Sequence, residues 1–78
     1  NPFNPSTIIN FQLGQLSNVT LKVYDLNGRL METLIHNEMF TAGSYNDNFN
    51  GSHLASGIYF YELEVDESCI NKKMLLIK

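Results

Sequence analysis

The chain has 78 residues, of which 44% are hydrophobic, and a formal net charge of −3. A chain of this length forms one small domain, here residues 1–78, with enough apolar side chains for a single core. The negative charge argues against nucleic acid or an anionic membrane as partner, because both require a basic patch. No apolar run approaches the roughly 18 residues that a membrane-spanning helix needs.

Apolar and polar side chains alternate in most segments between turn residues, which is the period of a β-strand. The strands predicted from this alternation are residues 6–13, 18–25, 30–36, 44–50, 58–65 and 69–78. The side chains predicted to share the core-facing side are Ile9, Phe11, Leu13, Val19, Leu21, Val23, Tyr45, Asp47, Phe49, Tyr59, Tyr61, Leu63 and Val65. Six strands at this spacing, without a convincing helical segment, predict an all-β fold, a small antiparallel β-sandwich of six or seven strands.

The third strand is the least regular of the six. Asn27-Gly28 before it predicts a hairpin, because both residues tolerate positive φ. Leu30–Met39 also has a two-turn helical pattern, but the hairpin signal outweighs it. Glu38–Phe40 is the candidate for a seventh short strand.

The last two strands form a predicted pair joined by the turn at residues 66–68. On their outer face, Glu62 and Glu64 are candidates to pair with Lys72 or Lys73. The segment Met74–Ile77 is apolar on both faces, so both pairs of side chains need cover, from the domain itself or from a partner. The sequence leaves open whether Met74 and Leu76 or Leu75 and Ile77 face outward.

No combination of residues predicts catalysis, a metal site or a bound cofactor. His36 and His53 are far apart and lack neighbouring ligands, which favours two ordinary surface histidines. The serines lack a nucleophile motif, and no glycine-rich phosphate loop is present. A lone carboxylate such as Asp47 is costly to bury, so a strand bulge or an exposed sheet end is its favoured place. Cys69 is the single cysteine, so it cannot form a disulfide within the chain.

Five segments together resemble the type A C-terminal sorting domain of the type IX secretion system. They are Asn1–Thr7, Val23–Arg29, Ala42–Tyr45, Leu54–Leu63 and Lys73–Lys78. The same order and spacing are similar to the immunoglobulin-like domain of flagellar hook-capping proteins. Asp47 departs from the pattern, because members usually carry an apolar residue there.

The resemblance implies an immunoglobulin-like sandwich over residues 6–78, preceded by an exposed leading segment at residues 1–5. It implies a non-catalytic secretion address at the end of a larger cargo protein. An outer-membrane translocon recognises such a domain in the periplasm, and a sortase then removes it and attaches the cargo to the cell surface.

On this basis we expect recognition to fall on one stretch: Lys73, Met74, Leu75, Leu76, Ile77 and Lys78. Its expected structural support is the motif Gly57, Ile58, Tyr59, Phe60 and Tyr61. An unprotected last strand is also a candidate for self-association. The alternative is a carbohydrate-binding or adhesive module that uses outward aromatic rings such as Tyr24 and Phe60.

Overall fold

The computed structural model describes residues 6–77, and all regular structure in that range is β-strand. The strands are β1 (Ser6–Leu13), β2 (Ser17–Asp25), β3 (Leu30–Phe40), β4 (Gly43–Asn50), β5 (Gly57–Val65) and β6 (Ser68–Leu76). The all-β prediction is confirmed, with strand bounds within two residues of those expected except at the end of β3. Between residues 6 and 77 there is no helix of the length and apolarity that crossing a bilayer requires.

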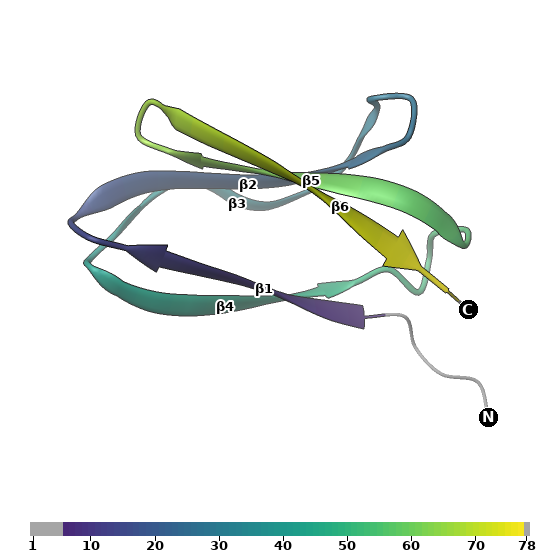
Figure 1. The fold of residues 1–78 in the computed structure, drawn as a ribbon, viewed down its shortest axis with the longest axis horizontal. Helices are drawn as coiled ribbons and strands as arrows, with labels where there is room; N and C mark the ends of the chain where they lie inside the picture. Colours follow the sequence, from purple (N-terminus) through teal and green to yellow (C-terminus); the bar gives the residue numbers. More distant parts are fainter. Residues whose placement is uncertain (1–5, 78) are drawn as a thin grey trace.

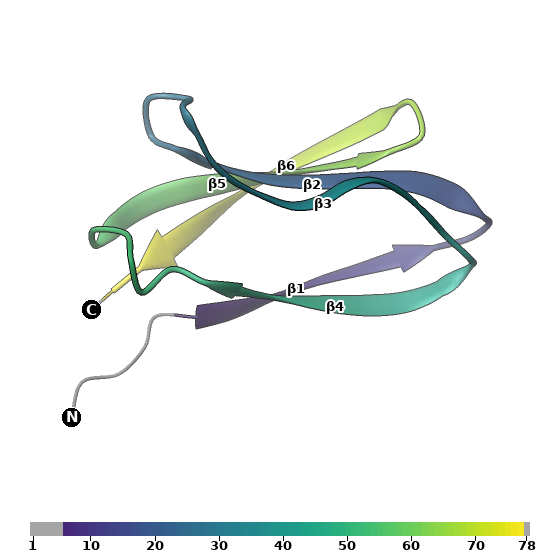
Figure 2. The same cartoon turned by 180° about the vertical axis from the view of Figure 1, so that it is seen from behind.

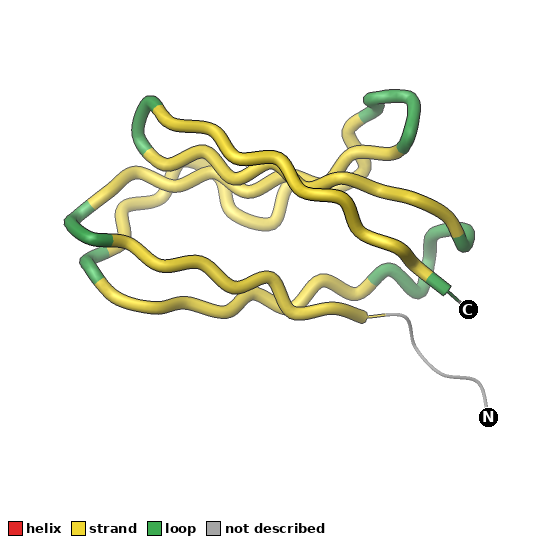
Figure 3. The backbone as a smooth tube through the Cα atoms, in the orientation of Figure 1, coloured by secondary structure: helices red, strands yellow, loops and turns green. Residues whose placement is uncertain are grey.

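The strands form two layers of unequal width (Figure 1). One sheet has four strands in the order β3-β2-β5-β6, and the other pairs β1 with β4. All pairings are antiparallel. The view from behind brings β3 and β4 to the front, so β1 and β6 lie on the opposite side of the sandwich (Figure 2). Figure 3 shows how short the connecting loops are.

The core lies between the two layers and consists of inward residues from every strand together with Leu54 of the β4–β5 loop. Its members are Ile9, Phe11, Leu13, Val19, Leu21, Val23, Ile35, Phe49, Leu54, Tyr59, Leu63, Met74 and Leu76. The alternation read from the sequence is confirmed for nine of these residues. The other four predicted core-facing residues, Tyr45, Asp47, Tyr61 and Val65, are only half-buried. At one end Phe11, Phe40 and Tyr45 pack ring against ring, with centroids 4.9–5.9 Å apart.

The hairpin predicted at Asn27-Gly28 forms, but with different geometry from that expected. Only Gly28 of the pair has positive φ, at 83°. The carboxylate of Asp25 holds the turn, because Oδ1 accepts hydrogen bonds from the backbone N–H groups of Asn27 and Arg29. Its Oδ2 lies 2.8 Å from Arg29 Nε. The backbone hydrogen bond from Arg29 is the main reason that the pKa of Asp25 is lowered.

The predicted seventh strand at Glu38–Phe40 is wrong, because these residues continue β3. The sequence pattern breaks there because the register between β2 and β3 shifts, leaving an irregular ladder. At the break Asn37 takes a φ of 53°, and its N–H donates to Thr20 Oγ1 at 3.0 Å. This bond explains why Thr20 is buried despite its place in the outward alternation.

The β5–β6 hairpin has nine consecutive residue pairs, from Val65↔Ser68 to Gly57↔Leu76. Its turn is Asp66-Glu67, where Asp66 has a φ of 54°. Asp66 also fastens the turn to β2, because its N–H donates to the carbonyl of Asn18 and its side chain accepts from the N–H of Asn18. The register of β6 is fixed at this end.

Candidate functional site

The described part of the predicted recognition segment, residues 73–77, comprises the last four residues of β6 and the residue that follows the strand. Met74 and Leu76 face the core, with exposed fractions of 9% and 3%. Leu75 and Ile77 face outward and are 64% and 57% exposed. The question left open by the sequence is answered: the outward pair is Leu75 and Ile77. Lys78 lies outside the described residues, as does the leading segment 1–5.

Leu76 is held by a close approach between β6 and the loop after β4. Gly51 is buried there, and a Cβ added to it would lie 2.7 Å from Leu76 Cδ1 and 3.3 Å from Phe49 Cε2. Such a distance is shorter than any real Cβ contact, so the position has room only for glycine unless Leu76 moves. The second half of β6 is therefore anchored in the core through its inward side chains.

The predicted supporting motif lies directly beside the recognition segment. Ile58 is opposite Leu75, Tyr59 is opposite Met74, and Phe60 is opposite Lys73. Tyr59 is buried, and its hydroxyl donates to the carbonyl of Ala55 at 2.8 Å. This bond ties the start of β5 to the preceding loop and so steadies the pairing partner of Met74.

Apolar side chains gather on the outer face where β5 begins and β6 ends. We call Ile58, Leu75 and Ile77 the outer patch; all three are exposed. Phe60 is half-buried on the same face and lies opposite Tyr24 of β2. Exposed apolar residues that cluster rather than scatter are typical of contact surfaces. Lys73 borders the patch and is the nearest cation on β6.

Tyr24 and Phe60, the aromatic residues of the carbohydrate alternative, are cross-strand neighbours. The hydroxyl of Tyr24 donates to Glu62 Oε1 at 3.3 Å. Burial, followed by the charge of Glu62, raises the pKa of Tyr24. Both rings are half-buried in the sheet face, so neither stands out as a free stacking platform.

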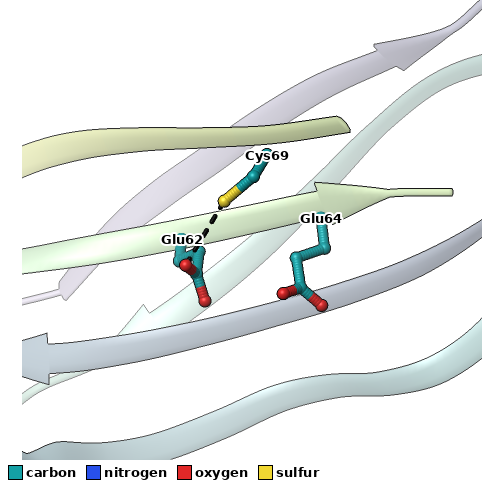
Figure 4. Close-up of side chains that lie close together, drawn as sticks. All are labelled: Glu62, Glu64 and Cys69. Carbon is teal, nitrogen blue, oxygen red and sulfur yellow. Dashed lines mark hydrogen bonds between the residues drawn. The ribbon is translucent and has the colours of Figure 1, made fainter. Parts of the chain in front are cut away.

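Glu62, Glu64 and Cys69 form a cluster that the sequence analysis missed (Figure 4). One side-chain atom of each lies within 4.8 Å of the others. The thiol of Cys69 donates to Glu62 Oε2 at 3.3 Å, and this bond is the main cause of its raised pKa. The raised pKa favours the protonated thiol, which is a weaker nucleophile and metal ligand than the thiolate. Counting pairs outward from the two-residue turn would have placed Cys69 opposite Glu64.

The pairing predicted between Glu62 or Glu64 and the lysines of β6 is wrong. In the register, Glu62 lies opposite Asn71 and Glu64 opposite Cys69, so the lysines fall opposite aromatic residues instead. Glu62 accepts hydrogen bonds from Tyr24 and Cys69. Within residues 6–77 the close charged contacts lie elsewhere: Arg29 pairs with Asp25 in the β2–β3 hairpin, and His53 lies near Glu32.

The remaining candidates lie apart from this region. His36 is exposed on β3, and His53 is exposed in the loop after β4, with its Nε2 4.0 Å from Glu32 Oε1. Asp47 shares the inward side of β4 with Phe49 but is only half-buried, because β4 has a free edge. A carboxylate there keeps contact with water, as expected for the exposed margin of a sheet.

Comparison with known proteins gives one result. Residues 1–78 match the model of a protein family described as "Secretion system C-terminal sorting domain". No curated protein matches the chain, and no solved structure does. The match covers the whole sequence, including the segments on which the resemblance was based.

Proposed function

The chain belongs to the type IX secretion system C-terminal sorting domains, a non-catalytic family, and from this premise we propose how its surface serves export. A sorting domain of this family interacts with the secretion machinery and is joined to a cargo protein. We propose that residues 1–78 are a single such domain, with the cargo preceding residue 1. The domain passes through the periplasm, and the cargo then reaches the cell surface or the medium.

The proposed recognition element is the segment Lys73–Lys78, supported by Gly57–Tyr61. The observation that carries the proposal is that alternate side chains of the segment are buried and exposed. Met74 and Leu76 are buried and hold the strand, while Leu75 and Ile77 are exposed and free to contact a receptor. A rigid strand that presents two large apolar side chains loses little conformational entropy on binding.

The receptor surface that covers Leu75 and Ile77 is an apolar surface of the outer-membrane translocon. Ile58, which lies opposite Leu75, extends the contact onto β5. Lys73, opposite Phe60, places a positive charge at the border of the outer patch. After translocation, a sortase component removes the domain from the cargo.

The test separates recognition from folding. Deleting residues 73–78 blocks export on this proposal, but it also removes Met74 and Leu76 from the core. The sharper variant is Leu75→Ser with Ile77→Ser, which changes only exposed side chains. We expect its circular-dichroism melting curve to stay near that of the parent, while the full-length cargo accumulates in the periplasm.

The matched control is Leu26→Ser with Leu30→Ser, two residues of similar exposure at the β2–β3 hairpin. Cargo with this control should reach the cell surface in normal amounts. Normal export of the Leu75→Ser, Ile77→Ser cargo would show that the recognised surface lies elsewhere.

The carbohydrate alternative stays a prediction, and titration of the chain with polysaccharides, followed by tyrosine fluorescence, tests it.

A further inference from the structure

The inner surface of the four-stranded sheet is wider than the sheet beneath it. We call the four-stranded sheet the upper sheet and the β1–β4 pair the lower sheet. Neighbouring strands lie about 4.8 Å apart, so the upper sheet is wider than the lower sheet by about 10 Å. Part of the inner face of the upper sheet therefore lacks cover. The exposure of individual side chains identifies which part this is.

The uncovered part lies along the first half of β6. Ile70 pairs with Leu63 and therefore faces inward, because directly paired residues share a face. Leu63 is buried, yet Ile70 is 49% exposed. Lys72, opposite Tyr61, is exposed on the same side, and Tyr61 and Val65 are only half-buried. We call Tyr61, Val65, Ile70 and Lys72 the uncovered strip.

The free edge of β1 lies on the same side of the sandwich as β6 (Figures 1 and 2). In the sheet as described, β1 pairs with β4 alone, so the backbone groups along its other edge have no strand partner. Its eight residues keep an unbroken register with β4 and include no charged residue and no proline. An edge of this kind is open to the addition of another strand.

The other three edges carry features that discourage strand addition. On β3 the register is broken where Asn37 takes positive φ. On β4 the inward residue Asp47 places a charge at the middle of the strand. On β6 the neighbouring Lys72 and Lys73 place one charge on each face. Bulges and inward charges are established means of protecting edge strands, so β1 is the least protected of the four.

We propose that the free edge of β1 accepts an extended strand from a partner polypeptide. The added strand becomes the third strand of the lower sheet and lies beneath the first half of β6. Its upward side chains then cover the uncovered strip, which requires apolar residues at alternate positions. It carries one carboxylate among them, because covering Lys72 without a counter-charge would bury an unpaired ammonium group.

A second copy of the chain does not fit this place. Two copies joined through their β1 edges by a two-fold axis would form one continuous lower sheet, with both upper sheets on the same side. Each upper sheet extends beyond its own β1, so the two β6 strands would occupy the same space above the seam. A single extended strand has no upper layer and avoids this clash. The site is also separate from the outer patch, which lies on the opposite face of the upper sheet.

The test uses the 78-residue chain labelled with ¹⁵N and two acetylated eight-residue peptides. Both peptides alternate valine and threonine, and one central valine is replaced by glutamate in the first and by lysine in the second. We expect the glutamate peptide to slow amide hydrogen exchange along β1 and to shift the signals of Ile70 and Lys72. It should bind about tenfold more tightly than the lysine peptide, and Lys72→Glu should reverse that preference.

Two substitutions on the same strand serve as a matched pair. Ile70→Ala should weaken binding of the glutamate peptide by about fivefold to tenfold, because it removes apolar surface that the peptide covers. Leu75→Ala changes the opposite face of β6 and should leave the affinity unchanged. Both side chains are largely exposed, so both variants should fold.

Several outcomes would overturn the proposal. One is equal binding of the two peptides, and another is exchange protection along β3 or β6 instead of β1. Absence of binding at millimolar peptide would do the same. A dimer of the chain in sedimentation velocity, lost in Ile70→Ala, would assign the uncovered strip to a second copy and contradict the single-strand occupant.

Discussion

The two halves of β6 are parts of one strand but have different surroundings. Residues 68–73 are exposed on both faces, whereas Met74 and Leu76 are buried and Leu75 between them is exposed. Pairing with β5 is unbroken through both halves, so the backbone does not cause the difference. What differs is the layer beneath, because the β4–β5 loop approaches Leu76 closely at Gly51, in the second half. Pairing places a strand in a sheet, and cover from the other layer buries it.

The largest effect expected from this comparison is on stability. Leu76→Ala should lower the free energy of unfolding by about 2–4 kcal/mol, because it leaves a cavity in the core. Leu75→Ala should change it by less than about 0.5 kcal/mol, because its side chain is exposed. Urea unfolding of both variants measures the difference. Equal losses would show that the inward side chains do not anchor the strand.

A smaller effect is expected at the contact that holds Leu76. Gly51→Ala should cost about 1–2 kcal/mol, because the added methyl group overlaps the Leu76 side chain. Combined with Leu76→Ala, its cost should shrink, since the overlap is then removed. Gly14→Ala is the control, because nothing lies within 4 Å of the added Cβ. If Gly51→Ala and Gly14→Ala lower the free energy of unfolding equally, the close approach of Gly51 to Leu76 does not affect stability.

The smallest expected effect is on the reactivity of the Cys69 thiol, which lies in the exposed first half of β6. The hydrogen bond to Glu62 raises the pKa of Cys69, so less thiolate is present at a given pH. Glu62→Gln should lower this pKa and speed alkylation by iodoacetamide at pH 8 by a few-fold. Glu67→Gln, in the adjacent turn, should leave the rate unchanged. An unchanged rate in Glu62→Gln would mean that the carboxylate does not control the thiol.

The sequence was sufficient for the strands and for most of the core, because the period of two is clear in β1, β2 and β5. It was insufficient at β3, where the backbone of Asn37 and the hydroxyl of Thr20 interact across strands. Such a bulge depends on a pairing partner distant in sequence, and no local pattern encodes it. The break therefore resembled a gap between two strands.

Whether Lys73–Lys78 is the recognised element stays a prediction, and its facing could not be read from Met74–Ile77 alone. All four residues are apolar, so alternation gives no sign of which pair is inward. The sign lies in the turn: counting from Val65↔Ser68 brings the inward Tyr59 opposite Met74. The same count would have placed Cys69 beside the glutamates. Gly51 lies outside the predicted strands, and only the packing of Leu76 reveals its role.

Because Leu76 packs against Gly51, the proposed recognition surface depends on folding of the whole domain. Residues about 25 positions apart must be in place before Leu75 and Ile77 are held side by side next to Ile58. An unfolded or partly folded chain contains the same recognition segment, residues 73–78, but does not hold its side chains in this arrangement. If the receptor binds these side chains as they are arranged in the folded domain, it responds to folding as well as to sequence. It then does not bind copies of the domain that have not finished folding.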